Sequence, residues 1–144
     1  MLYLDTSALL KLYIRESGSE AVQALIFSQR TPLPVWELQE AELCNALRLK
    51  VFWKEITSGQ ADSQIALFHT RRKKGQYQFP DIDRPSLIKT FHRLSEKTPR
   101  SGCRTLDILH VACAVELSAS CFLSFDSRQN DLARSAGLAV AALS

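Results

Sequence analysis

The chain has 144 residues, of which 46% are hydrophobic and 23% are charged, so its composition is that of an ordinary globular protein and excludes a disordered or fibrous one. Because this length suits one hydrophobic core, we expect residues 1–144 to form a single domain. No hydrophobic run approaches the roughly 20 residues that span a bilayer, and the first residues lack a signal-peptide pattern. We therefore expect a cytoplasmic protein with no membrane partner.

The formal net charge is +3, which alone says little about partners. If four of the 15 acidic residues surrounded a metal ion, the other 11 would face 18 Lys and Arg residues, a balance of +7 that suits a polyanionic substrate. The sequence also contains four cysteines without a Cys-x-x-Cys pair, namely Cys44, Cys103, Cys113 and Cys121. We interpret them as reduced core residues rather than as a zinc site or a disulfide framework.

The chain begins with a short hydrophobic run that ends at a carboxylate. Met1–Leu4 predicts a buried strand, and Asp5 follows it directly. Thr6 and Ser7 then precede a short helix predicted over Ala8–Ile14. Because ligands bind in the crevice beyond the carboxyl ends of parallel strands, Asp5 is the first candidate for a functional site.

Further along, the pattern predicts two helices separated by a short strand. Ser17 and Glu20 form a capping box that opens a helix ending near Thr31. A short strand is expected over Leu33–Trp36, with its proline at a strand start or an edge. The longest helix is expected over Glu37–Lys54.

Three acids lie near the start of this long helix, and helical geometry ranks them. At about 100° per residue, Glu42 lies on a hydrophobic stripe, whereas Glu37 and Glu40 project away from it. The other members of the stripe are Leu38, Leu49 and Trp53. Because burying an unpaired carboxylate is costly, Glu42 is the second candidate.

Residues 60–71 predict another helix, which ends in a basic cluster. The cluster consists of Arg71, Arg72, Lys73 and Lys74. Because cations at a helix C-terminus complement the helix dipole, a solvated helix end explains the cluster, and a contact with RNA is the alternative. Residues 76–84 predict a loop, Pro85–Lys97 a helix and Thr98–Gly102 a break.

Residues 105–118 are hydrophobic nearly all round and predict a central, buried helix. Asp107 lies in its first turn, where the helix dipole stabilises an anion, so an ordinary helix-start acid and a ligand both fit. His110, one turn later, is interpreted as a hydrogen-bonded core histidine.

A third strand, predicted over Cys121–Phe125, runs directly into Asp126. Asp126 fits either an N-cap of the helix expected over residues 127–136 or a site residue. Gly137 ends that helix, and Leu138–Ala142 predicts the last strand.

The alternation of strands and helices predicts an α/β fold with a mainly parallel sheet and helices on both faces. Asp5 and Asp126 both end strands at the carboxyl edge of that sheet. Glu42 and Asp107 lie near the starts of helices that should begin at the same edge. Four carboxylates in one crevice repel each other unless a cation neutralises them, and all-oxygen ligation favours Mg²⁺ or Mn²⁺ over Zn²⁺. Such a site would hydrolyse the phosphodiester bonds of a nucleic acid.

Four blocks of the sequence are similar to the PIN-domain ribonuclease family in their usual order. The blocks are Leu2–Leu9, Glu42–Arg48, Leu106–Ala112 and Leu123–Leu138. The resemblance spans nearly the whole chain. The small size resembles that of a stand-alone VapC-like toxin of a type II toxin–antitoxin system.

This resemblance implies a three-layer α/β/α PIN-like fold and a metal-dependent endoribonuclease. It implies an acidic quartet that holds one or two Mg²⁺ or Mn²⁺ ions and consists of Asp5, Glu42, Asp107 and Asp126. Thr6 and Ser7 match the family's small polar residues after the first acid, although helix capping explains them equally well. Ser124 keeps a hydroxyl where the family commonly has Thr. The resemblance also implies an RNA substrate, a homodimer and a cognate antitoxin protein, whereas residues 76–104 match no block of the family.

Two other functions are alternatives. A phosphatase of the haloacid-dehalogenase type needs a second Asp two residues after the first, and Ser7 occupies that position. The other alternative is a catalytically silent RNA- or protein-binding module with the same fold. An inactive descendant would be expected to lose at least one of the four acids.

Overall fold

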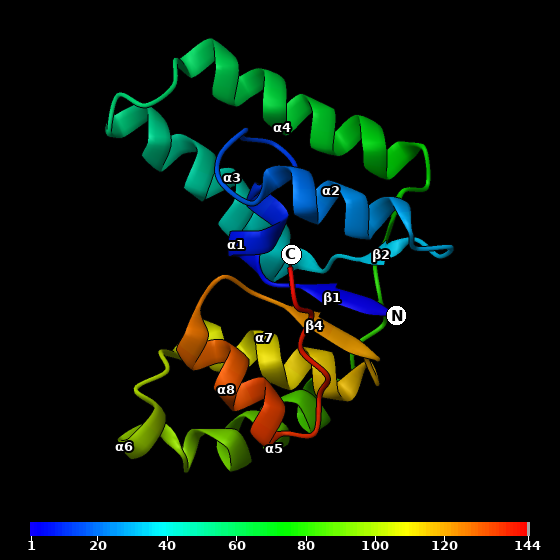
Figure 1. Cartoon of the computed structure of the whole chain (residues 1–144), viewed down its shortest axis with the longest axis vertical. Helices are drawn as coiled ribbons and strands as arrows, with labels where there is room; N and C mark the ends of the chain where they lie inside the picture. The colour runs from blue at the N-terminus through cyan, green and yellow to red at the C-terminus, as the bar shows by residue number, and fades with distance from the viewer. Residues whose placement is uncertain (144) are drawn as a thin grey trace. The chain divides into compact units, whose positions relative to one another are not determined.

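The computed structural model describes residues 1–143, and the chain divides into two compact units (Figure 1). One unit, here called the terminal unit, consists of Met1–Ala8 and Pro80–Ser144. The other, here called the middle unit, consists of Leu9–Phe79. The single domain expected over residues 1–144 stays a prediction.

The strands of the terminal unit confirm the predicted parallel pairing. β1 (Leu2–Leu4) pairs in parallel with β4 (Cys121–Leu123), and Tyr3 lies opposite Phe122. The rings of these two residues stack with their centroids 5.8 Å apart. Every residue of β1 is buried, as expected for a hydrophobic strand in a parallel sheet. The predicted last strand is reduced to a single parallel bridge between Val140 and Phe122.

Four helices belong to the terminal unit: α5 (Arg84–Ser95), α6 (Thr98–Ser101), α7 (Thr105–Glu116) and α8 (Ser127–Ser135). α5 packs along α7, and α8 packs against both α7 and β4 (Figure 1). Six of the seven residues from Ile108 to Ala114 of α7 are buried, which confirms the predicted central helix. The predicted break contains the single-turn helix α6, and Gly102 ends this helix with a left-handed φ of 66°.

The middle unit contains three helices and two strands: α2 (Ser19–Phe27), β2 (Leu33–Pro34), α3 (Glu37–Phe52), α4 (Ser58–Lys73) and β3 (Tyr77–Gln78). α3 and α4 pack side by side as a helical hairpin (Figure 1). β2 and β3 pair in parallel, with Leu33 opposite Tyr77. The prediction of a loop over residues 76–84 is therefore wrong at β3. A strand of only two residues is too short to produce an alternating hydrophobic pattern in the sequence, so the pattern could not reveal it.

The expected capping box before α2 is wrong. The helix begins at Ser19, and Gly18 precedes it with a left-handed φ of 87°. The hydroxyl of Ser19 donates to the backbone carbonyl of Ile14 at 3.0 Å. The loop is therefore closed by glycine geometry and by Ser19, and Ser17 does not cap the helix.

The short first helix also differs from its prediction. α1 (Thr6–Leu10) begins directly after Asp5, whereas the hydrophobic pattern predicted residues 8–14. All four cysteines, which lie within the described residues, are free thiols, and Cys103 and Cys113 are buried. Across residues 1–143, no helix has both the length and the hydrophobicity to cross a membrane.

Candidate functional site

Asp5, at the end of β1, is almost completely buried, with 5% of its surface exposed. Ser7 and Ser124 each place a hydroxyl oxygen 2.7 Å from one of its carboxylate oxygens. The backbone N–H of Ala8 donates to Oδ1 at 2.8 Å, so Asp5 also caps α1. Burial raises the pKa of Asp5, while these hydrogen bonds and the nearby His110 act in the opposite direction.

Ser124 and the fully buried Gln129 connect the acids of the terminal unit. Ser124 Oγ lies 2.7 Å from both Asp5 Oδ2 and Gln129 Oε1, so its single proton serves one of them at a time. Gln129 Nε2 donates to the backbone carbonyl of Asp107 at 3.1 Å. The backbone N–H of Asp126 donates to Ser124 Oγ at 3.0 Å. One hydroxyl and one amide thus link Asp5, Asp107 and Asp126.

Asp107 and Asp126 are half-buried acids at helix starts. Asp107 Oδ2 accepts a hydrogen bond from the backbone N–H of Arg104 at 3.1 Å. Asp126 Oδ1 accepts from the backbone N–H groups of Arg128 and Gln129, at 2.8 and 3.3 Å. Both acids therefore serve the helix-start role that was one alternative for each. Because a carboxylate has two oxygens, this role is compatible with ligation of a metal.

The buried thiol of Cys103 lies close to both of these acids. Burial raises the pKa of Cys103, and the charges of Asp107 and Asp126 raise it further, while Ser101 and Arg128 lower it. The two carboxylates therefore act on the same buried group. The three acids of the terminal unit lie in one neighbourhood, as their positions at strand and helix ends predict.

His110 is a buried, hydrogen-bonded core histidine, as predicted. Its Nδ1 lies 3.0 Å from the hydroxyl of Tyr3, and its Nε2 lies 3.3 Å from the hydroxyl of Thr6. Thr6 thus supports the histidine, whereas Ser7 contacts Asp5 directly.

Glu42, the remaining candidate acid, belongs to the middle unit, where it is half-buried on α3. The buried positions of this helix are Gln39, Leu43 and Leu47. Leu49 and Trp53 are 38% and 57% exposed, so the hydrophobic stripe that singled out Glu42 is wrong. A helical wheel assumes that hydrophobic residues face inward, and the end of α3 departs from this assumption. The role of Glu42 in a metal site stays a prediction.

The basic cluster closes α4, as expected for a solvated helix end. Two of its members have partners within the middle unit: Arg71 donates to the backbone carbonyl of Leu12 at 3.3 Å, and Arg72 pairs with Glu40 at 3.0 Å. Lys73 is exposed. Lys74 is the C-cap residue of the helix.

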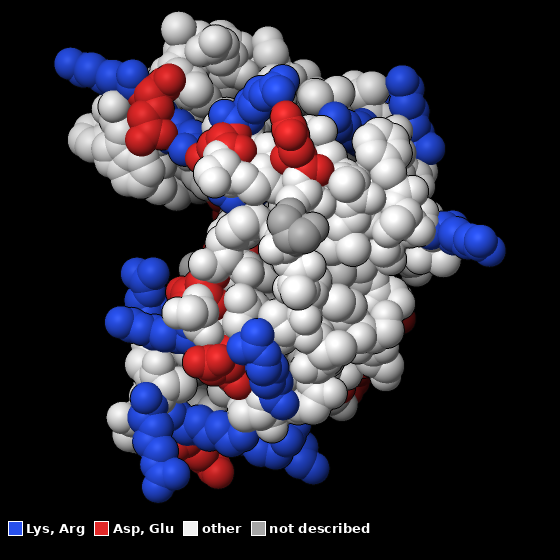
Figure 2. Space-filling view, viewed as in Figure 1, with Lys and Arg blue, Asp and Glu red and all other residues white. Residues whose placement is uncertain are grey.

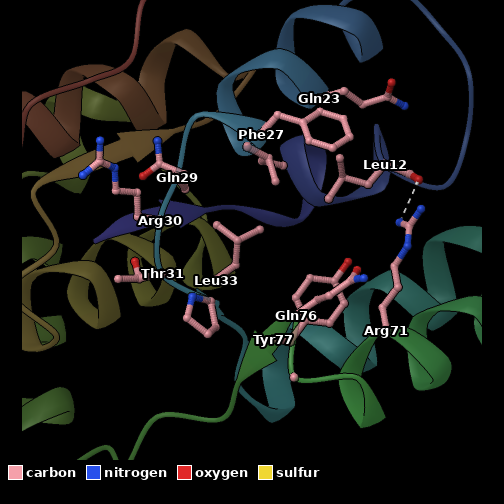
Figure 3. A pocket seen from close by; sticks show the side chains of 13 residues that line it. Leu12, Gln23, Phe27, Gln29, Arg30, Thr31, Leu33, Arg71, Gln76 and Tyr77 are labelled. Carbon is pink, nitrogen blue, oxygen red and sulfur yellow. Dashed lines mark hydrogen bonds between the residues drawn. The ribbon is translucent and has the colours of Figure 1, made fainter.

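A hollow of about 680 Å³ lies in the middle unit beside β2 and β3 (Figure 3). Its lining includes Arg30, Arg71 and Tyr77 and contains no Asp or Glu. Figure 3 shows the Arg71 side chain reaching the backbone of Leu12 at one end of the hollow. Because Mg²⁺ and Mn²⁺ prefer carboxylate oxygens, this hollow does not suit them.

The acids of the terminal unit offer oxygen donors only, which suits Mg²⁺ or Mn²⁺. Among residues 1–143, no three His, Cys, Asp or Glu side chains come close enough to bind one ion together. Mg²⁺ usually keeps several waters and takes one or two carboxylates from the protein. The acids present therefore fit such an ion by their chemistry, with water completing its coordination.

Gln129 is the residue of this network that sequence reasoning missed. It lies three and four residues before the buried Leu132 and Ala133, so the helical period places it on the inner face of α8. A buried polar side chain at that spacing is the signal that could have identified it.

The sequence matches the family model of the PIN domain over residues 2–135. The chain belongs to the PIN domain family. It is 30% identical over 145 residues to Ribonuclease VapC46 of Mycobacterium tuberculosis, and the match covers 98% of this chain and 96% of that protein. The predicted family is thus confirmed.

Solved structures with the same fold include two with a TM-score of 0.68. One is VapC20 of Mycobacterium tuberculosis, a toxin that cleaves the sarcin–ricin loop, with 13% identity over 91% of this chain and 94% of that chain. The other is VapBC2 of Rickettsia felis bound to a DNA fragment from its promoter, with 14% identity over 98% of each chain. These likenesses confirm the predicted PIN-like α/β fold.

Proposed function

We propose that this protein is a metal-dependent endoribonuclease with Asp5, Asp107 and Asp126 at its active site. The observation that carries this proposal is the buried network through Ser124 and Gln129 that links the three acids. Burying the Asp5 carboxylate is costly unless a cation offsets its charge, which favours a functional reason for the arrangement. The 30% identity to a protein named Ribonuclease VapC46 supports RNA as the substrate.

The side chains of the terminal unit have distinct tasks in this proposal. A bound Mg²⁺ or Mn²⁺ ion would polarise the phosphodiester and lower the pKa of a bound water. Ser7 and Ser124 hold the Asp5 carboxylate in one orientation, and the backbone N–H of Arg104 restrains Asp107. Because both hydroxyls contact Asp5, we assign them to positioning and not to nucleophilic attack.

We assign further residues by the family pattern. Glu42 is proposed as the fourth acid, and Thr6 as a support that acts through His110. The basic cluster at residues 71–74 is a proposed contact with RNA, in which the two lysines are the more available members because both arginines have protein partners.

We further propose that the protein is a homodimeric, cytoplasmic toxin that pairs with a cognate antitoxin protein. The relative named Ribonuclease VapC46 and the fold shared with VapBC2 of Rickettsia felis support a toxin–antitoxin assignment. Co-purification with the product of a neighbouring small gene tests the antitoxin, and light scattering tests the dimer.

The enzymatic proposal is tested by cleavage of labelled single-stranded RNA with Mn²⁺ and with EDTA. We expect turnover that EDTA abolishes and that Asp5→Asn and Asp107→Asn each lower about 100-fold or more, as for loss of one electrostatic group. Asp131→Asn is the matched control, because Asp131 is exposed on α8 and pairs only with Arg134 in the described chain. Turnover that survives EDTA and both site variants contradicts the proposal. RNA binding without turnover at saturating Mn²⁺ would instead favour the silent binding module.

A further inference from the structure

Two arginines frame the acids of the terminal unit. Arg104 directly precedes α7, and Arg128 is the second residue of α8. The backbone N–H of Arg104 donates to Asp107, and that of Arg128 donates to Asp126. Each acid is therefore hydrogen-bonded to the backbone of an arginine, and the Cα atom of that arginine lies next to the site.

Among the described residues, the Arg104 guanidinium forms one long ion pair and the Arg128 guanidinium forms none. The Arg104 side chain is 89% exposed, and its Nε lies 3.8 Å from Asp107 Oδ2, which is too far for a hydrogen bond. For Arg128, an exposed residue, the described part of the chain offers its guanidinium no hydrogen bond or ion pair. Both groups keep donors that can bind an anion.

Two other exposed arginines of the chain have close carboxylate partners. Arg134, on the same helix as Arg128, pairs with Asp131 at 2.9 Å. Arg15 pairs with Glu20 at 3.0 Å. The guanidinium donors of Arg15 and Arg134 are thus engaged with carboxylates, whereas those of Arg104 and Arg128 have no hydrogen-bond partner among the described residues.

The Arg128 guanidinium lies beside the loop that leads to Arg104. A Cβ atom added at Gly102 would lie 3.6 Å from Arg128 Nη1, so the bare glycine brings the backbone close to this group. The charge of Arg128 also lowers the pKa of Cys103, which the charges of Asp107 and Asp126 raise. Arg128 therefore lies within electrostatic range of the same buried group as both acids.

Lys and Arg side chains gather over the part of the terminal unit where α6 and α8 lie (Figure 2). The carboxylates repel every phosphate of an RNA strand that comes near them. One metal ion offsets this repulsion only for the phosphate that it contacts. Arginine binds phosphate through a planar set of donors, which makes it suited to hold the phosphates beside that point.

We propose that Arg104 and Arg128 bind the backbone phosphates that flank the bond to be cut, so that single-stranded RNA runs along the starts of α7 and α8. The choice of RNA rests on the proposed ribonuclease function. Phosphate contacts position a nucleic acid without reading its bases. The two arginines thus set the path of the strand, and base preference has to come from other residues.

The proposal is tested by fluorescence anisotropy of a labelled single-stranded RNA with the full chain in EDTA, where cleavage is blocked. We expect Arg104→Gln and Arg128→Gln each to weaken binding several-fold and to reduce the slope of log affinity against log salt by ~0.7, the value for one phosphate contact on a single strand. The double variant should lose both contributions. Arg134→Gln, on the same helix, should bind as the unmodified protein does.

Two further readouts separate this role from others. The melting temperature of the double variant should match that of the unmodified protein, because both side chains are exposed. Its Mn²⁺ affinity should not fall, because the change removes two positive charges beside the acids. A loss of either stability or Mn²⁺ affinity would indicate a structural role and overturn the proposal. A double variant that binds and cleaves RNA normally overturns the proposal but leaves the ribonuclease function intact. RNA binding that depends on these arginines, by a protein that never cleaves RNA, would support the arginine proposal and contradict the ribonuclease function. A polyglutamate peptide that binds through these arginines while RNA does not would also overturn it.

Discussion

The two units hold their candidate acids in different environments. In the terminal unit, Asp5 is 5% exposed and receives hydrogen bonds from two hydroxyls and a backbone N–H. In the middle unit, Glu42 is half-buried on α3, a helix that leaves Leu49 and Trp53 partly exposed. Deep burial of Asp5 costs stability, so its retention needs a reason beyond packing. Burial supplies no such argument for Glu42, whose assignment depends on the family pattern.

Each unit also has one fully buried glutamine, and substitution of these two residues is the strongest test of the difference between the units. Gln129 bonds to Ser124 and to the backbone carbonyl of Asp107, while Gln39 accepts the backbone N–H of Trp36 at 2.9 Å. We expect Gln129→Ala and Gln39→Ala each to lower the free energy of unfolding by about 2–4 kcal/mol, because each leaves a cavity and unpaired polar groups. Urea denaturation measures this change.

The two glutamine variants should differ in activity. At a temperature where both are folded, Gln129→Ala should lower RNA turnover more than Gln39→Ala, because Gln129 bonds directly to Ser124 and to the backbone of Asp107. Gln129→Glu is a useful companion, since it keeps the volume and adds a charge beside the acids. Equal turnover in Gln129→Ala and Gln39→Ala would show that the network does not position the site.

The second prediction concerns the pH dependence of stability. Because burial raises the pKa of Asp5 in the folded state, folding favours its protonated form. The favourable contribution of Asp5 is therefore present below its unfolded pKa of about 3.9 and is lost as the pH rises through the raised folded value. Asn does not titrate and can still accept the Ala8 N–H, so Asp5→Asn should be the more stable protein in EDTA at pH 7.

Thermal melts of both proteins between pH 3 and 8 measure this difference. The advantage of Asp5→Asn should shrink as the pH falls toward the unfolded pKa. A variant that is less stable than the unmodified protein at pH 7 would mean that the hydrogen bonds of Ser7 and Ser124 outweigh the cost of burial.

The sequence predicted the terminal unit better than the middle unit, for physical reasons. β1 and β4 are short hydrophobic runs that end at acids, and a parallel strand buried on both faces gives this pattern. α7 is hydrophobic nearly all round, which only a central helix can be. These signals are local, so the sequence alone predicts that Asp5, Asp107 and Asp126 lie near one another, and it makes the same prediction for Glu42.

The errors arose where tertiary contacts override local patterns. β3 consists of two residues, Tyr77 and Gln78, and exists because β2 offers it a partner. The hydrophobic residues at the end of α3 are exposed, so a helical wheel chose the wrong buried face. The start of α2 is set by the left-handed Gly18, which removed the expected capping role of Ser17. Gln129 was missed because a buried polar residue looks like a surface residue in sequence.

The smallest expected effect is that of Glu42→Gln, and it tests whether Glu42 is the fourth acid of the metal site. Glu42→Gln should change the free energy of unfolding in EDTA less than Gln129→Ala does, because Glu42 is half-buried and Gln preserves its shape. Saturating Mn²⁺ should stabilise the unmodified protein by mass action, since the folded state binds the ion. If Glu42 is the fourth acid, Glu42→Gln should gain less of this stabilisation, whereas Glu37→Gln, an exposed acid of the same helix, should gain all of it. Equal Mn²⁺-induced shifts in melting temperature for the two variants would remove Glu42 from the quartet and leave a site made by the terminal unit alone.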